Sequence, residues 1–195
     1  THTSGRFNFG VSPFLNYFEN YIYLNPTSNY FETLQIYEYT QAEVFRTGGE
    51  LTAGMQVNQE FRLDASAEYV YSRQTSGPKE GFTIPFSPPL IGMLSANYTL
   101  GNWSLFKDVN LNADLRIAAA QTDIVPPEEI TEGYQMLNLA VMSKLNLFNS
   151  QKPALLRVKL NNVFDTAYYD HTSFYRLIDV PEAGRNLSVS LTLPF

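Results

Sequence analysis

The end of the chain, from Arg185 to Phe195, alternates strictly between apolar and polar side chains. The apolar positions are Leu187, Val189, Leu191, Leu193 and Phe195, and the positions between them are Asn186, Ser188, Ser190 and Thr192. A period of two predicts a β-strand, because successive side chains of a strand point to opposite faces. A tilted strand of roughly 9–11 residues crosses the hydrocarbon layer of a membrane. One apolar face and one small, polar face are therefore typical of an outer-membrane barrel strand.

The composition is compatible with such a barrel. Charged residues make up 16% of the chain, below the roughly 25% of a typical globular protein. Aromatic residues make up 14%, with 13 Tyr, 14 Phe and 1 Trp, which suits aromatic girdles at membrane interfaces but also suits the core of a soluble sandwich. The sequence has no run of eighteen apolar residues, so no transmembrane helix is predicted.

Charge and cysteine content exclude several classes of function. The net charge is −6 and no basic cluster exists, which disfavours nucleic-acid binding. There are no cysteines, so disulfides and thiolate metal sites are excluded. The first residues, from Thr1 to Arg6, resemble neither a signal peptide nor a starting Met. We expect that either a signal was removed or the sequence is a fragment.

Alternating segments like the last one recur along the chain and predict eight strands. They are expected at residues 5–24, 31–58, 61–74, 90–100, 109–120, 133–147, 154–163 and 185–195. Residues 25–29 predict a turn, and the Gly48–Gly49 pair predicts a bulge or kink. Residues 133–147 also allow a helix, because Leu137, Val141 and Leu145 are four positions apart.

The predicted connections alternate in length. Shorter ones lie at 58–60, 101–108 and 148–153, and longer ones lie at 75–87, 121–132 and 164–183. Short turns at one end and long loops at the other are the arrangement of outer-membrane barrels, whose turns are periplasmic and whose loops are extracellular. A soluble sandwich has no reason for this alternation.

The predicted face opposite the apolar one carries seven charged residues. They are Arg62, Asp64, Glu68, Asp114, Arg116, Arg157 and Lys159. Unpaired charges are costly in lipid or in a dry core. We therefore predict that this face borders a lumen filled by water or by a plug.

The last forty residues carry a resemblance to a known family. Leu156–Asp165 reads Leu-Arg-Val-Lys-Leu-Asn-Asn-Val-Phe-Asp, and it is followed by Tyr168-Tyr169, Gly184-Arg185-Asn186 and the terminal Phe195. These motifs resemble the end of a TonB-dependent outer-membrane receptor, with Val163 at a position where the family usually has Leu. The stretches 84–89 and 48–51 also look like that family.

This resemblance implies the fold and the function. The fold would be all-β: about the last eight strands of an antiparallel, transmembrane 22-stranded β-barrel. Residues 1–195 would form the C-terminal part of that barrel without an internal domain boundary, and the plug domain and about fourteen strands would be absent. The whole receptor would take up a scarce large nutrient, such as siderophore-bound iron, haem, cobalamin or a glycan. TonB would supply the energy through the plug, and the barrel itself would have no enzymatic role.

Partners and location follow from the same resemblance. We expect contacts with outer-membrane lipid, the remaining strands and plug of the receptor, the TonB complex through the plug, and the barrel-assembly machinery. The long loops would be extracellular and the C-terminus periplasmic. Two alternatives remain open: a self-contained eight-stranded outer-membrane barrel with a structural or adhesive role, and a soluble sandwich or lipocalin-like binder.

Candidate site residues lie near the C-terminus. Leu191, Leu193 and Phe195 resemble the signal that the assembly machinery reads, and the alternative is an ordinary last strand. Aromatic and basic side chains suit contact with an anionic substrate, and four candidates are His171, Tyr175, Arg176 and Arg185.

Each of these candidates has a plainer interpretation. For Arg185 it is a pair with a neighbouring carboxylate or loop carbonyls, beside a Gly184 with an unusual backbone angle. Tyr168 and Tyr169 suit an interface girdle, and the other loop residues suit a solvated loop. The acidic loop with Glu128, Glu129 and Glu132 suits solvent better than a cation. No catalytic, metal or cofactor signature is present.

Overall fold

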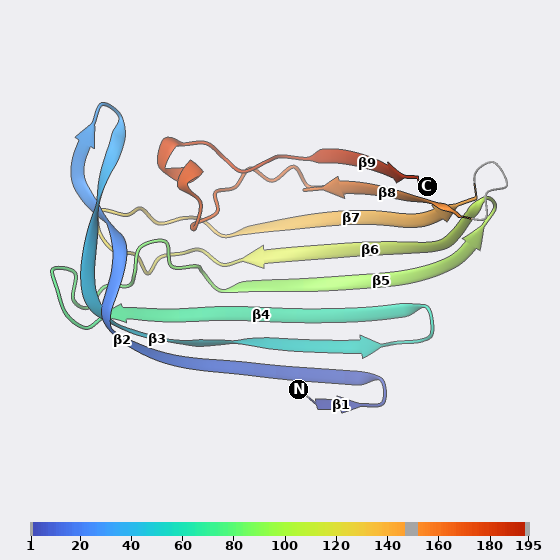
Figure 1. Cartoon of the computed structure of the whole chain (residues 1–195), viewed down its shortest axis with the longest axis horizontal. Helices are drawn as coiled ribbons and strands as arrows, with labels where there is room; N and C mark the ends of the chain where they lie inside the picture. The colour runs from blue at the N-terminus through green and yellow to red at the C-terminus, as the bar shows by residue number, and fades with distance from the viewer. Residues whose placement is uncertain (1, 147–151, 194–195) are drawn as a thin grey trace.

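The protein forms one antiparallel sheet of nine strands arranged in sequence order (Figure 1). The computed structural model describes residues 2–146 and 152–193. The strands are β1 (His2–Ser4), β2 (Phe7–Phe31), β3 (Leu34–Gln56), β4 (Phe61–Gln74), β5 (Ile91–Trp103), β6 (Phe106–Ala118), β7 (Tyr134–Leu145), β8 (Ala154–Asn161) and β9 (Asn186–Thr192). A short 3₁₀ helix, η1 (Phe174–Ile178), lies between β8 and β9. The prediction of an all-β antiparallel fold is confirmed, and the eight predicted strands correspond to β2–β9.

The sheet is open. Each strand pairs with its neighbours in sequence, and among the described residues no pairing joins β9 to β1 or β2. The alternative of a closed eight-stranded barrel is therefore not supported by the described strands. The sandwich alternative is not supported either, because the described strands belong to one sheet and no second sheet covers its apolar face.

The strand register separates the side chains into two faces. Directly paired residues share a face, so one row across the sheet consists of Phe9, Ala53, Ala65, Leu94, Leu115 and Leu137. The adjacent row on the other face consists of Asn8, Gly54, Asp64, Ser95, Asp114 and Asn138. The register also places all seven predicted charged residues on this second face, here called the polar face.

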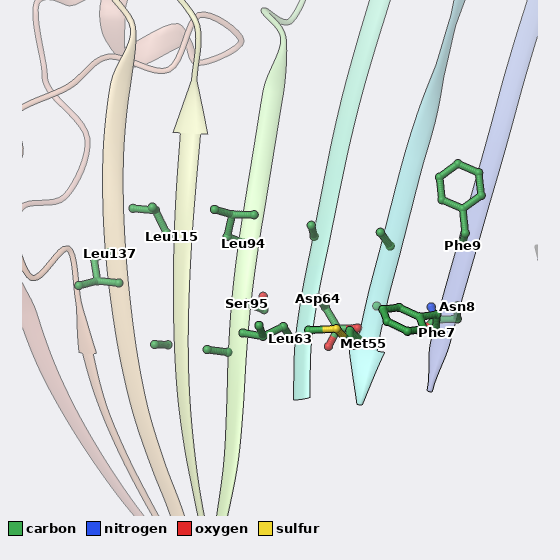
Figure 2. A pocket seen from close by; sticks show the side chains of 15 residues that line it. Phe7, Asn8, Phe9, Met55, Leu63, Asp64, Leu94, Ser95, Leu115 and Leu137 are labelled. Atoms are coloured by element: carbon green, nitrogen blue, oxygen red, sulfur yellow. The ribbon is translucent and has the colours of Figure 1, made fainter. Parts of the chain in front are cut away.

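Large apolar side chains on the opposite face, here called the apolar face, are exposed. Leu94 is 50% exposed and Leu187 is 66% exposed. An open groove of about 710 Å³ lies at this face. Figure 2 shows Phe7, Phe9 and Leu137 among the side chains that line it. An exposed apolar surface that extends over many strands is suited to lipid rather than to water.

The segment that also allowed a helix is strand β7, which pairs with β6 along its whole length and with β8 from Leu139 to Leu145. Other strand ends differ from the prediction. The expected eight-residue connection at 101–108 is wrong, because Trp103 pairs with Phe106 and leaves a two-residue turn. The indole of Trp103 and the ring of Phe106 stack with centroids 6.0 Å apart. Register shifts near Gly101 and between Lys107 and Asn110 accommodate the residues of this hairpin that have no directly opposite partner.

The turn predicted at residues 25–29 is also wrong, because β2 continues through them to Phe31. Pro26 pairs with Tyr37, and a register shift between Pro26 and Tyr30 accommodates the residues between them. Proline is tolerated at a bulge on a strand whose other edge is free. The actual turn lies at Glu32, whose φ is 55°. The β2–β3 hairpin therefore forms an arm at the end of the sheet where the long loops lie (Figure 1).

The Gly48–Gly49 pair does not form the predicted bulge. The pairing of β3 with both neighbours is continuous through these positions. A Cβ atom at Gly48 would lie 2.2 Å from the carbonyl oxygen of Tyr69 and 3.0 Å from the ring of Phe14. Glycine is thus required here by a close approach of the neighbouring strands, rather than by a change of register.

The connections alternate in length as predicted. One end of the sheet holds the turns at 5–6, 57–60 and 104–105, and the β7–β8 connection lies partly outside the described residues. The other end holds the tip of the β2–β3 arm and the long loops 75–90, 119–133 and 162–185, and we call it the loop end. The described part of the chain contains no helix long and apolar enough to cross a membrane.

Candidate functional site

The loop that follows β4 folds back against the polar face of its own strand. Ser72 and Gln74 are buried near the end of β4, and the Gln74 side-chain amide donates to the carbonyl oxygen of Thr83 at 2.8 Å. The hydroxyl of Tyr23 in the arm donates to Oε1 of Gln74 at 2.6 Å. Ile84 packs with Tyr23 in a small buried cluster. Loop 75–90 therefore turns toward the polar face instead of extending into solvent.

Glu128 joins the three long loops. Its side chain is only 2% exposed, and its Oε1 accepts hydrogen bonds from Nη2 of Arg176 and from the backbone N–H of Phe86, the latter at 3.0 Å. Nε2 of His171 lies 3.4 Å from the same oxygen. These partners come from loops 75–90 and 162–185, so a carboxylate expected in a solvated loop is instead buried and paired.

The local environment keeps the Glu128 carboxyl ionised. Burial alone would raise its pKa, but the contact with His171, the hydrogen bond from the Phe86 amide and the charge of Arg176 together hold the pKa below its ordinary value. A buried carboxylate is stable only when it is paired and hydrogen-bonded in this way. We call Glu128, His171 and Arg176 the Glu128 cluster.

Aromatic side chains surround the Glu128 cluster. The guanidinium carbon of Arg176 lies 5.2 Å from the ring centroid of Phe86, and the rings of Phe86 and Phe174 are 4.7 Å apart. Tyr37 of the arm lies 5.9 Å from Phe86 and 6.5 Å from Phe174 between ring centroids. The same packing thus ties the arm to the three loops.

A second set of polar contacts attaches loop 162–185 to the polar face of the sheet. Nη2 of Arg116 lies 3.6 Å from Oδ2 of Asp170, and the Tyr134 hydroxyl donates to the same oxygen at 3.3 Å. Burial would raise the pKa of Asp170, but hydrogen bonds from Thr172 and the charge of Arg116 lower it. One of the seven predicted charges therefore anchors a loop.

Beside these contacts lies a cavity of about 340 Å³, which we call the tyrosine cavity. Tyr134, Tyr168 and Tyr169 contribute its aromatic surface, and the ring centroids of Tyr134 and Tyr168 are 4.1 Å apart. The remaining lining residues are Glu129, Ile130, Thr131, Glu132, Gly133, Thr166, Ala167, Arg176 and Asp179. The cavity lies between the start of β7 and the residues that follow β8.

The four predicted substrate-contact residues occupy different environments. His171 and Arg176 are buried in the Glu128 cluster, with Arg176 only 5% exposed, so they are not available to an external anion. Tyr175 is 59% exposed. Arg185 is exposed, and its Nη2 lies 3.7 Å from Oδ2 of Asp165 while its Nη1 donates to the carbonyl oxygen of Val163. This agrees with the plainer interpretation of Arg185 as a paired residue.

Three smaller expectations require correction. Gly184 does not adopt the left-handed backbone region, and a Cβ there would approach Oδ1 of Asp165 at 3.0 Å. Tyr168 packs on Tyr134 rather than in a girdle on the apolar face. The Tyr169 hydroxyl donates to Oδ1 of Asp179 at 2.6 Å within the same loop.

The assembly-signal residues are only partly described. Leu191 and Leu193 are exposed, as expected for the apolar face, and Phe195 lies outside the described residues. Within residues 2–146 and 152–193, no group of three or more His, Cys, Asp or Glu side chains is arranged to hold a metal ion.

The burial of Glu128 could not be predicted from the sequence. Glu128 and Glu129 are adjacent and chemically identical, yet only Glu128 is buried. Its partner Arg176 is 48 positions away, so no local pattern distinguishes the two carboxylates. The nearest signal is the Pro126-Pro127 pair, which restricts the backbone just before Glu128.

Comparison with solved structures identifies the architecture. The copper transporter OprC matches with a TM-score of 0.81 at 19% identity, over 100% of this chain and 30% of that chain. The FrpB iron transporter from Neisseria meningitidis (F3-3 variant) matches with a TM-score of 0.71 at 15% identity, over 97% of this chain and 28% of that chain. BauA, the ferric preacinetobactin receptor from Acinetobacter baumannii, matches with a TM-score of 0.69 at 18% identity, over 96% and 27%. At these identities the likeness establishes the fold.

The chain thus spans less than a third of each of these solved proteins. A search of curated proteins finds no significant match. A family model described as TonB dependent receptor-like, beta-barrel, matches residues 2–163. This range covers most of the sheet but only the first part of the C-terminal motifs at residues 156–195. The similarity to OprC extends over the rest of these residues. The chain therefore belongs to the TonB-dependent receptor β-barrel family, whose members are outer-membrane proteins, and it corresponds to part of such a barrel.

Proposed function

We propose that this chain forms the C-terminal part of the wall of an outer-membrane receptor that takes up a scarce large nutrient. The class of nutrient includes siderophore-bound iron, haem, cobalamin and glycans, and TonB supplies the energy through the plug of the receptor. Solved relatives by fold are described as transporters of copper and iron and as a ferric siderophore receptor. The role of this chain is to provide a wall and outer loops rather than chemistry.

The observation that carries this proposal is the difference between the two faces of one continuous sheet. The apolar face exposes Leu94, Leu187 and other large side chains, as contact with lipid requires. The polar face carries seven charged residues in register, and the long loops fold toward it. A wall with lipid on one side and a polar passage on the other accounts for both features. The seven charged residues then line the lumen.

Orientation follows from the connections. Loops that bind nutrients are extracellular in such barrels, and the short turns are periplasmic. The loop end with the Glu128 cluster is therefore the extracellular end, and the C-terminus lies at the periplasmic end. The remaining strands and the plug pair with this wall, outer-membrane lipid surrounds it, and the TonB complex acts through the plug.

Nutrient uptake tests the proposal in cells. A strain that lacks the whole receptor should lose uptake of one radiolabelled compound from a panel of ferric siderophores, haem, cobalamin, copper and oligosaccharides. The same uptake should require TonB. Loss of no compound, or uptake that persists without TonB, would contradict the proposed function.

Orientation is tested by labelling, because this chain contains no cysteine of its own. The full receptor carries either Glu80→Cys in loop 75–90 or Leu105→Cys in a short turn, with any cysteines elsewhere replaced. A membrane-impermeant maleimide should label Glu80→Cys in intact cells and Leu105→Cys only after permeabilisation. The reverse pattern would invert the orientation.

The end of the chain serves as the assembly signal. The barrel-assembly machinery recognises the apolar residues Leu191, Leu193 and Phe195 of this segment. Removal of Phe195 from the receptor should lower its level in the outer membrane severalfold without lowering its synthesis. A normal outer-membrane level of the shortened receptor would refute this role.

A further inference from the structure

The tyrosine cavity at the loop end is lined by aromatic and acidic residues. Its volume of about 340 Å³ is near the lower end of the roughly 300–1,000 Å³ that small-molecule pockets occupy. Tyr134 is buried, and Tyr168 and Tyr169 are partly buried. Aromatic rings that are held by surrounding structure provide rigid, electron-rich faces for a ligand.

Packing and hydrogen bonds fix these rings. Tyr168 packs on Tyr134, and the Tyr134 hydroxyl is held between Arg116 and Asp170. The Tyr169 hydroxyl donates to the Asp179 carboxylate. The cavity therefore has preformed aromatic walls, which lowers the entropy cost of binding.

The charges that line the cavity do not balance. Glu129, Glu132 and Asp179 contribute three carboxylates, and Arg176 contributes the one basic side chain among the lining residues. The positive charge of Arg176 is already paired with Glu128, which does not line the cavity. The Nε of Arg176 also donates to the carbonyl oxygen of His171 at 2.8 Å. The cavity is therefore negative, although an isolated arginine in its wall suggests the opposite.

From these walls we infer that the tyrosine cavity binds an organic cation, such as a quaternary or primary ammonium group. Such a group is attracted to the faces of tyrosine rings and to carboxylates at the same time. An anionic group would meet three carboxylates without a free cation to balance them. At this cavity, the three carboxylates therefore exclude the kind of anionic substrate that the sequence suggested for His171 and Arg176.

The inference rests on the proposed function only for the position of the cavity at the extracellular end. If that function holds, the cationic group belongs to the nutrient or to a molecule that binds beside it. Binding is measured on the purified receptor without transport, so failure of the inference and failure of the proposed function are separate results.

Choline and its neutral isostere 3,3-dimethyl-1-butanol provide a matched pair of probes. The two have nearly the same shape and differ in one positive charge. Calorimetry or equilibrium dialysis with the purified full-length receptor should show saturable binding of choline that is about tenfold tighter than binding of the isostere. Citrate serves as the anionic probe and should not bind at the cavity.

Variants assign the binding to the cavity. Glu132→Gln and Tyr169→Leu should each weaken choline binding by about three- to tenfold, because each removes one of the attractions. Glu80→Gln removes an exposed carboxylate from another loop and should leave choline binding unchanged within about twofold. Limited proteolysis checks that the loops of each variant keep their fold.

Four results would overturn the inference, and three of them concern the probes. The first is an absence of saturable choline binding, and the second is equal binding of choline and the neutral isostere. The third is citrate binding that is tighter than choline binding and that Glu132→Gln strengthens further. Choline binding that Glu80→Gln weakens as much as Glu132→Gln would also overturn it, because the charge of the whole surface would then be responsible.

Discussion

The sheet and the loop end of this molecule are stabilised by opposite arrangements of polar and apolar groups. Across the sheet, Leu94 and Leu187 are exposed on one face, whereas the charged residues lie on the other. At the loop end, the charged Glu128 and Arg176 are buried and aromatic rings pack around them. The sheet is stabilised by backbone pairing and by an apolar environment on one face. The loop end is stabilised by specific contacts between residues that are distant in the sequence.

This difference has a consequence for function. A wall whose side chains alternate with a period of two tolerates many substitutions of similar polarity, because each position contributes little alone. The loop end depends on a few residues that connect four segments of the chain. Changes there are expected to release the loops and leave the wall intact.

The largest expected effect is at Glu128. Removal of one partner from a buried ion pair costs about 3–5 kcal/mol, because the other charge stays buried without compensation. Glu128→Ala should therefore increase hydrogen exchange and protease cleavage in loops 119–133 and 162–185, and leave exchange in β4–β8 unchanged.

Glu129→Gln is the matched control for this change. Glu129 is the exposed neighbour of Glu128, and its substitution should leave loop exchange unchanged. If Glu128→Ala also opens the sheet, or if it has no effect on the loops, the loop end and the wall are not stabilised independently of each other.

A smaller effect is expected on the apolar face. Leu94→Arg places a charge in contact with lipid, which costs about 2–4 kcal/mol near the bilayer midplane. Ser95→Arg places the same residue on the polar face and should cost much less. The fraction of receptor that keeps its folded mobility on a gel without heating measures both. Equal loss of folded receptor for the two variants would mean that the faces are not lipid and lumen.

Within the sheet, Gly48 is the exception to this tolerance. Gly48→Ala brings a Cβ into the carbonyl oxygen of Tyr69, and overpacking of this kind costs about 1–3 kcal/mol. Gly92→Ala is the control, because its nearest contact is 3.7 Å away. The thermal unfolding midpoints of the two variants in detergent should differ by several degrees. Equal midpoints would show that the strands around Gly48 can move apart without cost.

The smallest effect is expected at Arg185. The side chains of Arg185 and Asp165 are both exposed, and exposed ion pairs contribute about 0–1 kcal/mol to the free energy of unfolding. Arg185→Gln should change neither unfolding nor nutrient uptake measurably. A loss of uptake with normal folding would restore Arg185 as a substrate-contact residue.

Strands were predictable from sequence where a local pattern decides the structure. The alternation along residues 61–74 matches β4 at both ends, and β7 is a strand because its neighbours on both sides offer ladder partners. The errors occurred at residues 25–29 and 101–108, which contain turn-forming residues. There the pairing partner on the next strand continues the ladder through a bulge, and that partner is not visible in the local sequence.

The candidate site was much less predictable. Arg176 and His171 were predicted as substrate-contact candidates, whereas the structure buries both beside Glu128, which is more than forty positions away along the chain. The sign of the charge in the tyrosine cavity depends on which carboxylate pairs with Arg176. In the sequence that arginine has no visible partner and suggests an anionic ligand, whereas in the structure Glu128 pairs with it and the carboxylates of the cavity favour a cation.

The central claim is that successive side chains of this sheet face lipid and lumen in turn. Nitroxide labels on single cysteines placed at each position from 111 to 117 of β6 test it most directly, in the full receptor reconstituted into bilayers. Accessibility to oxygen should be high at the odd positions, which lie on the apolar face, and accessibility to a water-soluble nickel chelate should be high at the even positions. Accessibility without a period of two, or with the nickel chelate favouring the odd positions, would contradict the account.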